Sequence, residues 1–387
     1  MQTEQPEVQY LPFSFEGNGG EFFRIWIVNI ALTILTLGVY SAWAKVRTNR
    51  YFYANTYLND SNFEYNAEPK RILIGRVIVV SLYALFIIFF KYLAMMEVAL
   101  SIALIALLAM PWLIRQAVSF KLRNTSYRNV PFRYTGTTFA FYKFFIFNLF
   151  FFILIVGVAS FVPIVNMIVV FLLMGYIYVR FKALIINNSH YGDGNFHFAG
   201  ETGDVYRIYL KIAGWMFLIG MGIVVVMAIL GAILNGIYGG EGIDELATIS
   251  QISSTESEVE VDVSMIDVLT PLLGLFFIYL PIIFFQKGLS DGYHSNFVRD
   301  NTTLNRAGLK GIMSPMKLGW ISLTNVLALI FSFGLLYPWT KVRYIKYKLE
   351  HTYFRCANYE QFESYGYVQG STIGEETVDF FDIDIGL

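Results

Sequence analysis

The sequence predicts an all-α polytopic membrane protein: six firm transmembrane helices in three hairpins, plus two terminal segments that are broken and re-entrant or else span the bilayer. Three observations support this class. The chain is 56% hydrophobic and only 15% charged, whereas soluble domains carry about a quarter charged residues. Several apolar segments have the roughly 20 residues that a bilayer core of about 30 Å requires. A short polar signature recurs between them, and its β-hairpins could form a small cytoplasmic sheet.

The signature consists of an Asn, seven residues, a Phe, any residue, an aromatic residue, any residue and a small residue. Its copies contain Asn55, Phe63 and Tyr65; Asn124, Phe132 and Tyr134; and Asn188, Phe196 and Phe198. We expect a degraded copy at Asn296, with Leu304 and Gly308, and a truncated copy at 13–17. Asn tolerates the left-handed conformation that ends many helices, and aromatics at period two lie on one face of a strand. Each copy therefore predicts a helix end followed by a β-hairpin.

The chain divides into three parts. Residues 1–21 form an N-terminal tail with a short strand, 22–355 a single membrane domain of pseudo-repeats, and 356–387 an acidic tail. The signature loops are 50–71, 119–143, 183–207 and 287–317, and an acidic loop covers 237–265. The six firm segments are 72–95, 98–118, 144–162, 164–186, 208–236 and 266–286. Tight joins at Met96-Glu97 and Pro163 make antiparallel hairpins, since proline ends a helix.

Basic residues predict the orientation. Lysines and arginines flank all four signature loops, whereas the opposite helix ends carry Lys91 beside Glu97 and a loop without basic residues. Positive residues favour the cytoplasmic side, so the signature loops are expected there and loop 237–265 in the periplasm. A solvated acidic loop is favoured over a calcium or cationic-substrate antechamber, because the spacing of Ca²⁺ ligands is missing.

The segments 22–44 and 318–340 are copies of each other. A constant offset of 296 positions relates Asn29 to Asn325 and Gly38 to Gly334. If both segments crossed the bilayer, the basic residues after 340 would lie outside, against the charge rule. We therefore favour re-entrant helices that turn near Gly38 and Gly334, although each segment is long enough for an ordinary span.

Few polar groups lie at membrane depth, where they usually mark function. The candidate cavity-lining residues are Asn29, Asn325, Asn148 and Asn166. Lys91 and Glu97 form a candidate outer pair, either a lysine that reaches outward to water or a gate. The four histidines lack metal-ligand spacing, and no nucleophile elbow, phosphate loop or His-Glu-x-x-His occurs. We therefore expect no enzyme, catalytic residue, cofactor or metal.

The expected partner is the lipid bilayer. The cytoplasmic basic belt is interleaved with tyrosines, which fits contact with anionic lipids. No nucleic-acid partner is expected, because the positive-inside placement already accounts for the charge.

Several motifs together resemble a known family. They are Phe13-Ser14-Phe15-Glu16-Gly17, Gly38-Val39-Tyr40-Ser41-Ala42-Trp43, Arg50-Tyr51-Phe52-Tyr53-Ala54-Asn55 and Phe63-Glu64-Tyr65. From about residue 13 to about residue 355, the chain resembles the bacterial inner-membrane YjgN-like family, domain of unknown function 898. The resemblance implies a multi-pass protein of the bacterial inner membrane and supplies no activity, substrate or catalytic residue.

Two functions follow as hypotheses. The first, which base rates for polytopic bacterial proteins favour, is a transporter or channel for a small or amphipathic solute, with a hydrated path lined by the four asparagines. The second is a scaffold or lipid-interacting protein without transport. It predicts a dry, close-packed centre and an exposed cytoplasmic aromatic surface.

Overall fold

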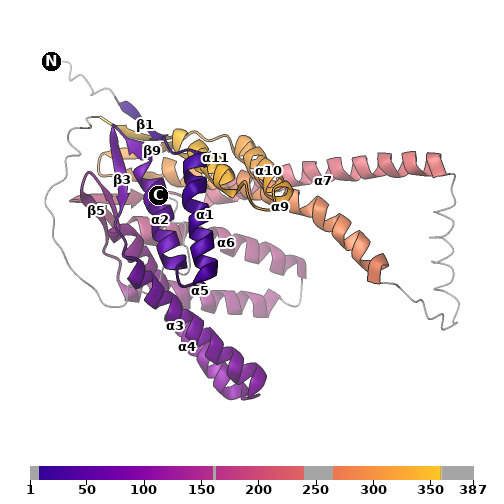
Figure 1. Cartoon of the computed structure of the whole chain (residues 1–387), viewed down its shortest axis with the longest axis horizontal. Helices are drawn as coiled ribbons and strands as arrows, with labels where there is room; N and C mark the ends of the chain where they lie inside the picture. Colours follow the sequence, from indigo (N-terminus) through magenta and orange to yellow (C-terminus); the bar gives the residue numbers. More distant parts are fainter. Residues whose placement is uncertain (1–7, 160–162, 239–264, 358, 360–387) are drawn as a thin grey trace.

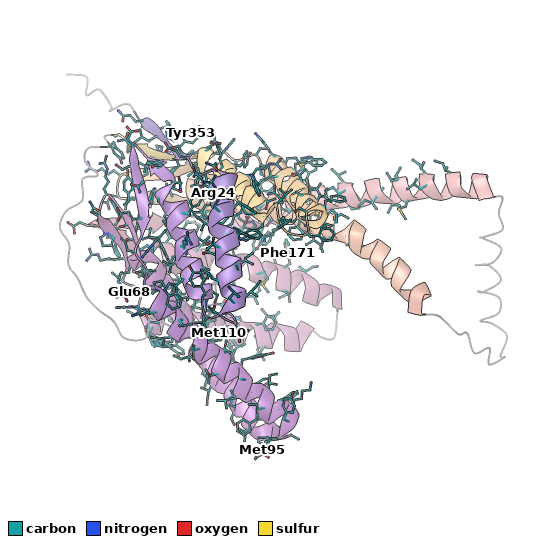
Figure 2. All side chains as sticks on the ribbon, viewed as in Figure 1. Arg24, Glu68, Met95, Met110, Phe171 and Tyr353 are labelled. Atoms are coloured by element: carbon teal, nitrogen blue, oxygen red, sulfur yellow. The ribbon has the colours of Figure 1, made fainter. Side chains whose placement is uncertain are left out.

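The computed structural model describes residues 8–159, 163–238, 265–357 and 359. Short strands gather at one end of the molecule, and helices project from them (Figure 1). Met95 lies at the far tip of one helical hairpin, whereas Tyr353 lies among the strands (Figure 2). Residues 239–264 of the predicted periplasmic loop and 360–387 of the acidic tail lie outside the described residues.

Ten antiparallel strands form a closed barrel in the order β1-β10-β9-β8-β7-β6-β5-β4-β3-β2. Four β-hairpins come from the signature loops: β2 (Thr56–Leu58) with β3 (Ser61–Tyr65), β4 (Thr125–Tyr127) with β5 (Val130–Tyr134), β6 (Ser189–Tyr191) with β7 (Gly194–Phe198), and β8 (Thr302–Leu304) with β9 (Ala307–Gly311). The two ends of the chain supply the fifth pair, β1 (Gln9–Phe15) and β10 (Thr352–Cys356).

The predicted all-α class is therefore wrong. The hairpins do not merely cap helices, because each one pairs with its neighbours until the sheet closes on itself. Closure removes the unpaired strand edges that an open sheet would expose. The first strand of each signature hairpin has only three residues, too few to show an alternating pattern in the sequence.

Eleven helical elements are described. They are α1 (Gly19–Leu35), α2 (Ser41–Ala54), α3 (Pro69–Ile87), the π-helix η1 (Ile88–Tyr92), α4 (Met96–Arg123), α5 (Thr138–Ala159), α6 (Pro163–Ile186), α7 (Thr202–Tyr238), α9 (Met265–Asp300), α10 (Pro315–Phe331) and α11 (Tyr337–Glu350). Five spans in the described part are long and apolar enough to cross a membrane: α3 with η1, α4, α5, α6 and α7. Helix α9 runs through the sixth predicted segment, 266–286.

The two copied terminal segments are each broken into two helices. Between α1 and α2, Leu37 and Gly38 have φ angles of 50° and 93°, and between α10 and α11, Phe333 and Gly334 have 50° and 85°. Glycine adopts such left-handed angles readily, and the chain reverses at the glycines where the break is predicted. Helices α1 and α10 each have 17 residues, fewer than the roughly 20 that span a bilayer core. That the reversals lie inside the bilayer stays a prediction.

The side chains that line the barrel fill it. We call the four signature hairpins and the β1–β10 pair the five units of the barrel. Where two neighbouring units meet, one inward-facing side chain from each lies opposite the other: Phe13 with Leu58, Phe63 with Tyr127, Phe132 with Tyr191, Phe196 with Leu304, and Leu309 with Phe354. All ten belong to one hydrophobic cluster, and the rings of Phe63 and Tyr127 are 4.7 Å apart. The barrel is thus a packed core, as small barrels usually are.

Candidate functional site

The signature residues build the barrel. The side-chain amides of Asn55, Asn124 and Asn188 each donate to the backbone carbonyl four residues earlier, at 2.7, 2.8 and 2.7 Å. These carbonyls belong to the last helical turn, where the helix offers its carbonyls few partners; those of Tyr51 and Phe120 also accept from the backbone N–H of Asn55 and Asn124, at 3.2 and 3.1 Å. The backbone of Asn55 has φ −96° and that of Asn124 has φ −87°, so the expected left-handed conformation is absent at both. The amide itself ends the helix.

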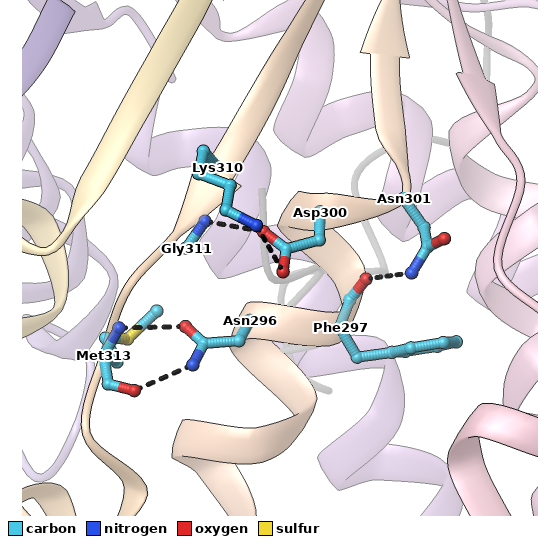
Figure 3. A network of polar contacts seen from close by, with 7 residues as sticks. All are labelled: Asn296, Phe297, Asp300, Asn301, Lys310, Gly311 and Met313. Carbon is cyan, nitrogen blue, oxygen red and sulfur yellow. Dashed lines mark hydrogen bonds and ion pairs between the residues drawn. The ribbon is translucent and has the colours of Figure 1, made fainter. Parts of the chain in front are cut away.

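The fourth copy of the signature lies five residues later than predicted. Asn301, and not Asn296, follows the end of α9 and donates to Phe297 O at 2.8 Å. The residue at the aromatic position is then Gly311. Asn296 occupies the space beside it, where it donates to Met313 O at 2.8 Å and accepts from Met313 N at 3.0 Å (Figure 3). The fourth turn correspondingly lies at Asn305, with φ 49°.

A second feature of the signature escaped the sequence analysis. In all five units, a Ser or Thr hydroxyl at the start of the strand donates to the carbonyl four residues earlier, at 2.6–2.9 Å: Thr56, Thr125, Ser189, Thr302 and Thr352. The preceding residue is Asn in four units and His351 in the fifth. The recurring Asn-Thr or Asn-Ser pair was the signal that could have placed the fourth copy correctly.

The aromatic residue of the signature explains why the residue two positions later is small. A Cβ atom added at Gly136 would lie 2.2 Å from Tyr134 Oη, and one at Gly200 would lie 2.4 Å from Phe198 Cζ. The ring therefore folds over the residue two positions later, which has to be small. Phe63 and Phe132 face the barrel interior, and Tyr65, Tyr134, Phe196 and Phe198 are buried.

Tyr359 lies in the barrel core. It is 9% exposed and contacts Phe354, and its hydroxyl hydrogen-bonds to that of Tyr127, which donates to Leu58 O. Arg128 lies 4.9 Å from the centre of the Tyr359 ring. Burial raises the pKa of Tyr359 above its ordinary value and that of Tyr191 to about 12, so both stay neutral hydrogen-bonding groups at physiological pH.

A cleft of about 990 Å³ lies beside the barrel, between α1, α2 and α3, with Tyr337 and Lys341 of α11 at its edge. Its apolar lining includes Ile34, Leu37, Val39, Val77 and Val80, and all of these are exposed. Ligand sites are typically concave and apolar with a few placed polar groups. This cleft is therefore the candidate functional site.

Within the described part of the chain, the charged side chains that line the cleft are all basic. They are Lys45 of α2, Arg76 of α3 and Lys341 of α11, each half-buried. Arg76 donates to Ser41 Oγ across the α2–α3 interface. The Lys341 ammonium lies 5.1 Å from the centre of the Phe52 ring and 5.7 Å from that of Tyr337. Such a lining favours a ligand with a negative charge.

Asn29 lies on the wall of this cleft and is 4% exposed. Its Nδ2 donates to Ala44 O at 3.4 Å, which ties α1 to α2. Its Oδ1 is buried and accepts no hydrogen bond from the described residues. An unsatisfied buried acceptor costs about 1–3 kcal/mol.

The other predicted cavity residues do not join Asn29 in the cleft. Asn325 ties α10 to α11 through Thr340 O at 3.0 Å. Asn148 is in α5, where its amide donates to Phe144 O at 2.7 Å and its Oδ1 has no partner. The side chain of Asn166 lies outside the described residues. Of the three candidates whose side chains are described, Asn29 alone lines this cleft.

Lys91 and Glu97 lie on either side of the tight join between η1 and α4. Both are exposed, and in the described part of the chain no ion pair joins them. The arrangement favours the outward-reaching lysine over the gate.

These features define a class of protein: a polytopic membrane protein whose broken and long helical hairpins project from a small closed barrel. The chain belongs to the family described as "Bacterial protein of unknown function (DUF898)", whose model matches residues 10–380. It is similar to "Inner membrane protein YjgN" of Salmonella typhimurium strain LT2, 40% identical over 83 residues, which is 21% of this chain and 20% of that protein. It is also similar to "Inner membrane protein YjgN" of Escherichia coli strain K12, 34% identical over 93 residues, 24% of this chain and 21% of that protein.

The aligned part spans about a fifth of the length of these curated relatives. No solved structure matches the chain. The predicted family is confirmed, and with the apolar helices it makes this a multi-pass protein of an inner-membrane family. The cytoplasmic placement of the loops stays a prediction.

Proposed function

We propose that the protein is a carrier for an amphipathic anionic solute, which it takes up in the cleft between α1, α2 and α3. The observation that carries this proposal is the lining of the cleft. The basic residues Lys45, Arg76 and Lys341 line the cleft, and exposed apolar residues such as Val77 and Val80 border the same space. An amphipathic solute can place its charged group among the cations while its apolar part stays in lipid.

A lateral route fits the packed barrel. The ten paired side chains and Tyr359 fill the barrel interior, which argues against a water-filled path through it. A solute that keeps its tail in the bilayer needs no such path. We further propose that the barrel lies in the cytoplasm, because lysines and arginines accumulate at the helix ends beside it. The cleft then faces the cytoplasmic leaflet.

The second hypothesis, a lipid-interacting scaffold without transport, has one observation in its favour. The centre of the strand region is close-packed, as that hypothesis expects. However, the aromatic residues of the signature are turned into the barrel or buried against helices, so they offer no extended aromatic surface to a partner.

Reconstitution tests transport directly. Purified protein is placed in vesicles that contain a fluorescent, short-chain anionic lipid, and a membrane-impermeant reductant quenches the outer leaflet. We expect protein-dependent quenching of the inner-leaflet label. Asn29→Leu should slow it strongly, and Asn325→Leu, outside the cleft, serves as the matched control. Quenching no faster than in empty vesicles, or equal rates for both variants, would refute the carrier.

A further inference from the structure

We propose that the cleft between α1, α2 and α3 binds the head group of an anionic phospholipid that carries a hydroxyl next to its phosphate, as a glycerol head group does. This deepens the proposed function, on which it rests for the physiological role of the site. Three properties of the cleft select this chemistry: its charge, its unpaired oxygen and its apolar border.

The charge selects an anion. Lys45, Arg76 and Lys341 come from three different helices, and none of the described residues that line the cleft is acidic. Their positions are half-buried, where the lower effective dielectric strengthens the attraction to a negative group. A zwitterionic head group that brings its own ammonium would meet three like charges there. A phosphodiester with no further cation fits better.

The unpaired oxygen selects a hydrogen-bond donor. Asn29 Nδ2 is held by Ala44 O, and this fixes Oδ1 as the group that needs a partner. A carboxylate or an ionised phosphate monoester has acceptors only and would leave the oxygen unpaired. A hydroxyl beside the phosphate satisfies it, and buried polar groups in folded proteins are nearly always satisfied.

The apolar border selects a lipid over a soluble anion. Ile34 is 68% exposed, and Val77 and Val80 are exposed beside it on α3. Acyl chains lying along these residues would contact the apolar surface that begins at the cleft. A free glycerol phosphate gains nothing there.

In the second broken helical hairpin, the oxygen of the corresponding amide, that of Asn325, has a hydrogen-bond partner from within the protein. Arg343 donates to Thr324 Oγ1 at 2.9 Å and to Asn325 Oδ1 at 3.4 Å, so the second hairpin satisfies its own amide oxygen. At the same offset of 296 positions, Val28 stands in place of Thr324 and Arg47 in place of Arg343. Val28 cannot hold Arg47 over the amide, and the Asn29 oxygen stays unpaired. Among the differences between the two hairpins, the replacement of Thr324 by Val28 is the one that accounts for the unpaired oxygen.

The test measures lipid binding to the detergent-purified full chain by native mass spectrometry. The probes are phosphatidylglycerol, phosphatidic acid, phosphatidylethanolamine and soluble glycerol 3-phosphate. We expect phosphatidylglycerol to bind at least tenfold more tightly than the other three. Asn29→Leu should weaken it about tenfold, the value of one hydrogen bond, while Asn325→Leu leaves it unchanged.

The sharpest variant is Val28→Thr. It recreates the Thr324 arrangement, so Arg47 should fill the acceptor from within the protein and lower phosphatidylglycerol binding as Asn29→Leu does. Val28 is 41% exposed, and a threonine there adds no buried polar atom, so folding should be retained. Unchanged binding in this variant and in Asn29→Leu overturns the assignment.

Two further outcomes also overturn it. Equal affinity for phosphatidic acid removes the role of the hydroxyl, and equal affinity for glycerol 3-phosphate removes that of the acyl chains. Failure of the carrier proposal looks different, since specific, Asn29-dependent binding without lipid movement in vesicles refutes transport and supports the binding site. Lipid movement without head-group preference supports transport and overturns the site.

Discussion

The hydroxyl that begins each strand can be tested at two neighbouring threonines of β8. Thr302 is 1% exposed, and its hydroxyl donates to Val298 O at 2.6 Å. Thr302→Val keeps the side-chain shape and removes the donor, which leaves a buried carbonyl of the last turn of α9 without this partner. Such a loss costs about 1–3 kcal/mol. Thr303 is half-buried, and its hydroxyl donates a long hydrogen bond to His197 O at 3.4 Å.

Thr303→Val is therefore the matched control, one residue away on the same strand, and it should cost less than about 0.5 kcal/mol. Both variants are compared in detergent by thermal melting and by denaturant titration, with tryptophan fluorescence as the signal. We expect a clearly lower midpoint for Thr302→Val alone. Equal midpoints for the two variants would show that the hydroxyl does not stabilise the junction between helix and strand, and the account of the signature would fail.

Three further predictions follow from the fold. Burial between two tyrosine rings lowers the pKa of His294, so below about pH 6.5 the unfolded chain binds more protons than the folded one. The melting temperature should therefore fall from pH 7.5 to pH 5.5, and it should fall less in His294→Gln. Identical pH profiles for the wild type and this variant would contradict the prediction. Gly136→Ala should destabilise by about 1–3 kcal/mol because its Cβ would meet Tyr134, and Tyr134→Val in the same chain should recover part of that loss; additive losses would argue against the contact. Met95 lies at the tip of a helical hairpin, and Asp60 lies in a turn of the barrel. In a cysteine-free background, Met95→Cys should therefore react with an impermeant reagent on whole cells, and Asp60→Cys should react only after lysis. The reverse pattern would show that the orientation is inverted.

The membrane helices could be predicted because their signal is local and long. Segments such as 72–95 and 208–236 are predominantly apolar; α7 contains the second, and α3 together with η1 covers most of the first. The breaks at Gly38 and Gly334 were equally readable, since the two copies share the glycine at the same offset. Hydropathy and repetition need no knowledge of distant contacts.

The closed barrel could not be predicted from the same signals. Its closure depends on β1 pairing with β10, and local sequence patterns do not predict pairing between strands so far apart in the chain. The fourth signature was misplaced because Gly311 carries no ring, and Asn296 fills the space that a ring would occupy. The unpaired oxygen of Asn29 was also beyond prediction. It depends on contacts between helices: Arg343 reaches Thr324 and Asn325 in the second hairpin, whereas Val28 stands beside Asn29 in the first.

The pairing of β1 with β10 has a consequence for biosynthesis. The ribosome makes β1 before the other described elements and β10 after them, so the helical hairpins between them emerge while β1 still lacks one neighbour. Unpaired edges of this kind invite wrong pairing. Completion of the ring is therefore necessarily a late, post-insertion step, and a chain truncated before Thr352 should reach the membrane yet remain a target for quality-control proteases.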